Sequence, residues 1–139
     1  MIAAPHIVQQ ELFHGPTGAI QQQRFQQAIT TGQLVIQDPQ TLIPTLSKGE
    51  QAAVSLALAM HVPVLLDDYR AYQHASQHYS AQALSVAQCL VFFLIQGSLN
   101  LRDAETIYVA LKKTGATNAV FLRKAAEQIH AQGGRLLWP

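Results

Sequence analysis

Cysteine is nearly absent from this chain of 139 residues, which contains only Cys89. A single cysteine cannot form an intramolecular disulfide, and it leaves no set of thiolates for a structural zinc site. Its neighbours Leu90 and Val91 are apolar, which is typical of a buried, unreactive thiol. The composition therefore fits a protein of a reducing compartment, and we expect a cytoplasmic location.

Charged residues are scarce as well, at 12% of the chain, and nine cations against eight acids give a formal net charge of +1. This balance is too near neutral to indicate a nucleic-acid partner from bulk electrostatics. Four cations gather in the C-terminal third of the chain, at Lys112, Lys113, Arg123 and Lys124. They fit a solvated helix face better than a dedicated basic patch.

Long apolar runs are missing too. The longest, residues 83–95, falls short of the roughly 20 residues that a membrane-spanning helix requires. Residues 1–6 lack the basic start and apolar centre of a secretory signal, so we expect neither a leader nor a membrane anchor.

A glycine-rich phosphate loop and a serine nucleophile elbow are also absent from the sequence. The remaining possibilities are a metal-dependent activity or no catalytic activity.

Hydrophobic residues make up 49% of the chain, which at this length predicts one domain with a well-buried core. Apolar spacing and capping residues predict helices at 5–13, 19–30, 48–60, 70–75, 83–95, 103–113 and 118–132. Strands are predicted at 34–36 and 62–66, and the second is a continuous apolar run of the kind found in covered parallel sheets. The pattern indicates an α/β fold with a helical C-terminal half.

Acidic side chains occur where an α/β protein exposes its chemistry. Glu50 lies at the start of a predicted helix, and Asp67 and Asp68 directly follow the predicted strand 62–66. Carboxylates at the carboxyl end of a strand that face a helix-borne carboxylate can hold Mg²⁺ or Mn²⁺. Such an ion can activate water against a phosphodiester.

Each acid also has a structural interpretation. Glu50 follows Ser47 by three residues, the spacing of a capping box. Asp67 or Asp68 is placed to cap the next helix, and Glu11 alone fits an ordinary surface glutamate. The residues by themselves leave both interpretations open.

Three segments together resemble the PIN-domain nucleases, most closely a branch of predicted nucleic-acid-binding PIN proteins. Residues 4–12 (APHIVQQEL) are similar to the family's proline, valine and Glu-Leu segment. Residues 48–59 (KGEQAAVSLALA) are similar to its Gly-Glu and alanine-rich helix, and residues 64–71 (VLLDDYRA) to its Leu-Leu-x-Asp-Asp strand end. The resemblance covers residues 3–75 well and the helical remainder, 76–132, loosely.

The resemblance implies a three-layer α/β/α fold with a parallel sheet, formed by residues 1–139 as a single PIN-like domain. It implies that Glu11, Glu50 and Asp67 bind Mg²⁺ or Mn²⁺, with Asp68 as an alternate that orients water or a second ion. The chemistry of the family is metal-dependent cleavage of RNA, often by the toxin of a toxin–antitoxin pair. RNA and a cognate antitoxin are therefore the expected partners.

Two departures from the family accompany this resemblance. PIN domains begin with a central strand that ends in a catalytic aspartate, and this chain starts too close to its proline segment to include them. A misassigned start, a loss of activity, or a second chain that supplies the strand would each account for the difference. Residues 77–82 also lack the short strand and glycine of the family, which leaves the far edge of the sheet undefined.

The alternative function is a non-catalytic interaction module of the same ancestry. An uncovered parallel strand or the apolar helix 83–95 would then associate with a second copy of the chain or with a partner, so we expect an oligomer.

Histidines and tyrosines add one pattern each. His74 and His78 are four residues apart and would share a helix face, although no third ligand is placed by the sequence to complete a metal site. Tyr72 and Tyr79, near Arg70, offer rings for stacking on RNA bases, but packing fits them better.

Overall fold

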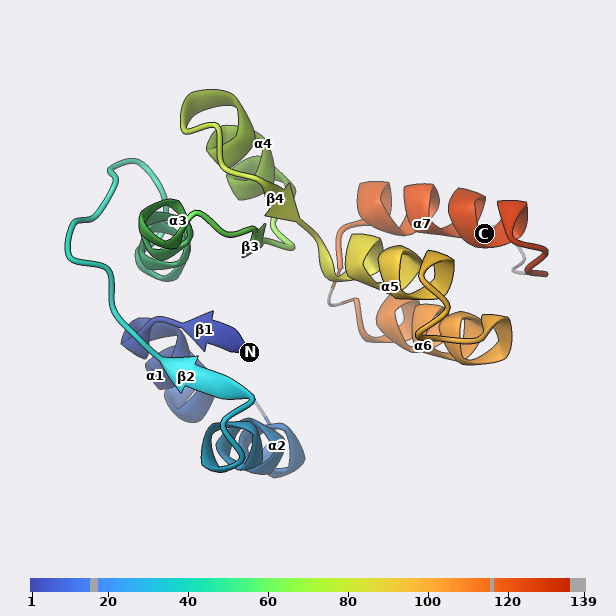
Figure 1. Ribbon diagram of the computed structural model, residues 1–139, viewed down its shortest axis with the longest axis horizontal. Coiled ribbons are helices and arrows are strands. Elements are labelled where there is room, and N and C mark those ends of the chain that lie inside the picture. The colour runs from blue at the N-terminus through green and yellow to red at the C-terminus, as the bar shows by residue number, and fades with distance from the viewer. Residues whose placement is uncertain (16–17, 116, 136–139) are drawn as a thin grey trace. The chain divides into compact units, whose positions relative to one another are not determined.

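The structure, a computed structural model, describes residues 1–15, 18–115 and 117–135 (Figure 1). It is mixed α/β and mostly helical. The elements follow in the order β1 (Ile2–Ala4), α1 (His6–His14), α2 (Ala19–Thr30), β2 (Leu34–Ile36), α3 (Lys48–Met60), β3 (Val64–Leu65), α4 (Tyr69–His78), β4 (Ala83–Leu84), α5 (Val86–Ile95), α6 (Leu101–Thr114) and α7 (Ala119–Ala131). The chain divides into two compact units, Met1–Val64 and Leu65–Pro139.

In the first unit, β1 and β2 form a parallel pair in which Ile2 lies opposite Leu34 and Ala4 opposite Ile36. The sequence predicted β2 but not β1. Strand β1 ends at Ala4, where the following proline favours extended backbone, and Pro5 is already the N-cap of α1. Helices α1 and α2 connect the two strands, α2 packs against β2, and α1 packs against α3.

Helix α3 begins after Ser47, as predicted, and buries small and branched residues around most of its circumference. The predicted strand 62–66 is shorter in the structure. The backbone N–H of Val62 bonds back to Ala57 O at 3.1 Å, and Pro63 has no N–H for a ladder. Strand β3 is therefore confined to Val64–Leu65.

In the second unit, the predicted helix 83–95 begins at Val86, which corrects the sequence prediction. Residues Ala83–Leu84 form β4 instead, which pairs with β3. Just beyond β3, Leu66 N donates a hydrogen bond to Leu84 O at 2.8 Å. Helix α5 then begins with a capping box. Gln88 N donates to Ser85 Oγ at 3.1 Å, and Ser85 N donates to Gln88 Oε1 at 2.7 Å.

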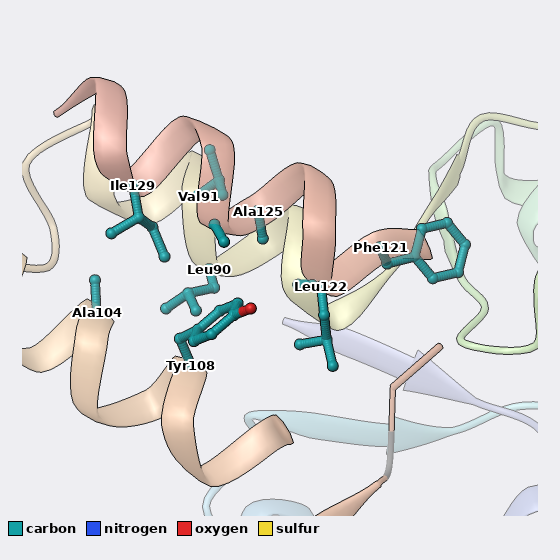
Figure 2. Packing of buried hydrophobic residues seen from close by; sticks show 10 residues of the cluster. Leu90, Val91, Ala104, Tyr108, Phe121, Leu122, Ala125 and Ile129 are labelled. Atoms are coloured by element: carbon teal, nitrogen blue, oxygen red, sulfur yellow. The ribbon is translucent and has the colours of Figure 1, made fainter. Parts of the chain in front are cut away.

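Helices α5, α6 and α7 pack side by side around the main hydrophobic core, and α6 and α7 run in opposite directions (Figure 1). Figure 2 shows Leu90 of α5, Tyr108 of α6 and Ile129 of α7 directed into the common interior. The core consists of Ala87, Leu90, Val91, Ala104, Tyr108, Phe121, Leu122, Ala125, Ala126 and Ile129. None of the helices in the described residues is long and apolar enough to cross a membrane.

Aromatic rings attach α4 to this bundle. Tyr72 meets Phe121 edge-on with ring centroids 4.9 Å apart, and Tyr69 meets the same ring at 5.6 Å. The hydroxyl of Tyr72 also lies 3.5 Å from Gln88 Nε2. Packing, rather than an open stacking platform, therefore accounts for Tyr72.

Candidate functional site

In the first unit, the side chain of Glu11 on α1 lies beside Gly49 of α3. A Cβ atom placed on Gly49 would lie 2.7 Å from Glu11 Oε2 and 3.0 Å from Oε1. Gly49 is buried while Glu11 is exposed, so the carboxylate reaches over the glycine from outside. Glycine is thus the residue that lets this carboxylate contact the first turn of α3.

The same turn carries Glu50. Its Oε2 accepts a hydrogen bond from Ser47 Oγ at 2.7 Å and from Ser47 N at 3.3 Å. The bond from Ser47 N belongs to the predicted capping box, which is present at the start of α3, so Glu50 has the structural role that its spacing indicated. Two carboxylates, Glu11 and Glu50, therefore meet the N-terminal turn of α3, where the helix dipole favours negative charge.

Asp68 belongs to the second unit and caps α4. Its Oδ1 accepts a hydrogen bond from Ala71 N at 2.8 Å, the arrangement of an N-cap aspartate. Of the two acids after β3, Asp68 is the one whose predicted capping role is observed.

Asp67 has a partner that its sequence position did not reveal. Its Oδ1 accepts a hydrogen bond from Val86 N at 3.0 Å, at the start of α5. Burial raises the pKa of the Asp67 carboxyl above its ordinary value, and the bond from Val86 lowers it in part. The carboxylate thus joins the end of β3 to the first turn of α5.

Cys89 lies one turn further along α5. Burial raises the pKa of its thiol, and the negative charge of Asp67 raises it further. A thiol with a raised pKa forms little thiolate at neutral pH, and thiolate is the reactive form. The electrostatics favour the low reactivity that the sequence indicated, although the side chain is half-buried rather than buried as predicted.

The predicted metal ligands are divided between the two units, with Glu11 and Glu50 in the first and Asp67 and Asp68 in the second. Within residues 1–15, 18–115 and 117–135, no group of three or more His, Cys, Asp or Glu side chains is arranged to hold a metal ion. The structure therefore brings Glu11 to the turn of Glu50 and shows separate helix-terminus contacts for the two aspartates.

The clustered cations Lys112, Lys113, Arg123 and Lys124 are all exposed, the first two in the last turn of α6 and the other two on α7. Comparison of the chain with models of protein families, with curated proteins and with solved structures finds no match. The functional assignment therefore depends on the chain's own residues.

Two signals in the sequence could have revealed more of this geometry. A glycine directly before a helix-start glutamate leaves room for a second side chain, and Gly49 has that position. Ser85 and Gln88 have capping-box spacing, and they place the N-terminus of α5 where Asp67 reaches it.

Proposed function

We propose that this chain is a PIN-like ribonuclease that depends on Mg²⁺ or Mn²⁺. The observation that supports it best is the position of Glu11 at the turn that carries Glu50. The resemblance assigned both residues as ligands although they are distant in sequence. A shared ion requires its ligands to lie near one another, and both residues contact the first turn of α3.

The donor set suits a hard cation. Mg²⁺ in proteins commonly takes one or two carboxylates and completes its shell with water and phosphate oxygens. Glu11 and Glu50 supply such a pair, and the resemblance adds Asp67 as a third ligand and Asp68 as an alternate. When bound, the ion supplies a water of lowered pKa as a nucleophile and neutralises charge that develops on the phosphodiester.

The chain's own residues prepare this chemistry in three ways. Gly49 leaves space for the Glu11 carboxylate, and Ser47 fixes the Glu50 carboxylate through two hydrogen bonds. Held in this way, Glu50 loses less rotamer freedom when it takes a ligand. Asp67 is partly buried, and its Oδ1 is fixed at the start of α5 by the bond that it accepts from Val86 N.

The test compares thermal unfolding with and without Mg²⁺ or Mn²⁺ in the full chain and in Glu11→Gln, Glu50→Gln and Asp67→Asn. The glutamine at position 50 retains the capping-box acceptor while it removes the charge. Exposed Glu127 on α7 provides the matched control, Glu127→Gln. We expect the metal to raise Tm in the parent and the control and not in the three variants.

A second measurement addresses catalysis directly. Cleavage of a labelled single-stranded RNA should require the divalent ion and stop on addition of EDTA. A melting curve that neither ion changes, together with no metal-dependent cleavage, would show that the proposed activity is wrong.

The interaction module remains the second candidate because α5 exposes large apolar side chains. Phe92 is 54% exposed, Phe93 45% and Ile95 59%. Apolar groups concentrated in this way are typical of surfaces that associate. Light scattering should then show a dimer or larger species that Phe92→Ser reduces, whereas a monodisperse monomer would count against this function.

A further inference from the structure

His74 and His78 of α4 form a close pair of imidazoles. Their ring centroids lie 4.5 Å apart, and the ring planes differ by 40°. His78 is exposed and His74 half-buried, and both belong to the second unit. One helix turn therefore presents two nitrogen ligands that the proposed ribonuclease activity does not use.

The separation suits a single bound ion. Zinc–imidazole bonds are about 2.0–2.1 Å, so two nitrogens on one ion lie at most about 4 Å apart. Residues four apart share one face of a helix, and ring centroids 4.5 Å apart place both imidazoles within reach of one ion. A metal takes one nitrogen of each ring, which leaves the other nitrogen to keep a different hydrogen-bond partner.

The surroundings decide which ion fits and how it is held. Imidazole suits Zn²⁺, Ni²⁺ and Cu²⁺, whereas Mg²⁺ and Ca²⁺ prefer oxygen. Tyr79 contacts His74 edge-on at 5.6 Å and limits the motion of that ring. Arg70 lies one turn before His74 on the same face, and its charge weakens the binding of any cation.

No third His, Cys, Asp or Glu completes this pair in the described part of the chain. The remaining coordination positions would therefore belong to water. We propose that His74 and His78 bind one divalent transition-metal ion of the Zn²⁺, Ni²⁺ or Cu²⁺ class, with open positions, independently of the carboxylates of the first unit.

The test titrates Ni²⁺ alone into the full chain by calorimetry in the presence of excess Mg²⁺. We expect one ion per chain. Because even the loss of a residue that only orients a ligand costs about tenfold or more in affinity, His74→Gln and His78→Gln should each weaken binding by at least that factor. His14→Gln, at an exposed histidine in the last turn of α1, should leave it unchanged.

Two further readouts make the result decisive. Paramagnetic Ni²⁺ should broaden the imidazole NMR signals of His74 and His78 before those of any other histidine. Glu11→Gln should bind Ni²⁺ like the parent, which separates this site from the proposed ribonuclease centre. Absence of Ni²⁺ binding, or binding that survives both histidine substitutions in variants that melt normally in EDTA, would overturn the proposal.

Discussion

The Glu11 carboxylate lies so close to Gly49 that a Cβ at position 49 would stand 2.7 Å from Oε2. The contact joins α1 to the N-terminal turn of α3 within the first unit. The contact depends on the absence of a side chain at position 49. Substitution of Gly49 is therefore the most direct way to test the candidate site.

Gly49→Ala should displace the flexible Glu11 carboxylate while it leaves the backbone in place. Alanine favours helix over glycine by up to about 1 kcal/mol. Loss of an acid from a helix N-terminus costs about 0.3–1 kcal/mol. The two effects nearly cancel, so urea denaturation should show a free energy of unfolding within about 1 kcal/mol of the parent, since neither term exceeds that size.

The same substitution should abolish thermal protection by Mg²⁺ or Mn²⁺, because Glu11 no longer meets the turn of Glu50. The control is Gly49→Ala in a Glu11→Ala background. There the added methyl group meets no carboxylate, and it should stabilise the chain relative to Glu11→Ala alone. Unchanged metal protection in Gly49→Ala would show that Glu11 is not a ligand.

Asp68→Ala should destabilise the second unit through loss of the α4 cap. Replacement of a capping aspartate by alanine costs about 0.5–2 kcal/mol, and Asp68→Asn should cost little because asparagine also caps well. Denaturant unfolding followed by circular dichroism gives both values. If Asp68 acts only as a cap, Asp68→Asn retains RNA cleavage, whereas loss of cleavage with normal stability would assign it a chemical role.

Asp67→Asn should change how stability depends on pH. Burial raises the pKa of Asp67 in the folded chain, so the folded state holds this proton more tightly than the unfolded state. The stabilisation is present below the ordinary aspartate pKa and is lost as pH rises through the raised one. The asparagine of the variant does not titrate, and its side-chain oxygen still offers Val86 N an acceptor.

Melting temperatures should therefore be measured from acidic to neutral pH. We expect the Tm of Asp67→Asn to rise relative to that of the parent as the pH increases. Asp103→Asn, at an exposed aspartate in the first turn of α6, is the control for a general charge effect. A difference between Asp67→Asn and the parent that stays constant with pH would contradict the raised pKa.

Local signals predicted much of the fold. The α2 helix and the β2 strand occupy the predicted ranges, and α3 begins after Ser47 as its capping box indicated. Strand β1 was missed because three residues become a strand only through pairing with β2, a partner distant in sequence. The start of α5 was misplaced because the apolar run 83–95 concealed the cap at Ser85.

The candidate site was predictable only where it is local. The bonds of Glu50 to Ser47 and of Asp68 to Ala71 span three residues each, and the spacing indicated both. The approach of Glu11 to Gly49 and the bond from Val86 to Asp67 join separate elements. Only tertiary packing creates such contacts, so no window of sequence contains them.

RNA binding should depend on the exposed cations of α6 and α7. Among the described residues, no acidic group lies within ion-pair distance of Lys112 or Lys113, so their charge is available to phosphates. For single strands, each neutralised phosphate contributes about 0.7 to the slope of log affinity against log salt. Removal of both charges should lower the slope by about 1.4 if each lysine contacts one phosphate.

Fluorescence anisotropy with a labelled single-stranded RNA in EDTA measures this slope without cleavage. The double variant Lys112→Gln/Lys113→Gln is compared with Arg24→Gln, which removes an exposed cation from α2 in the first unit. Both lysines also interact favourably with the C-terminal dipole of α6, so Tm must be measured in parallel. Equal slopes in the parent and the double variant, with Tm retained, would show that RNA does not contact this end of α6.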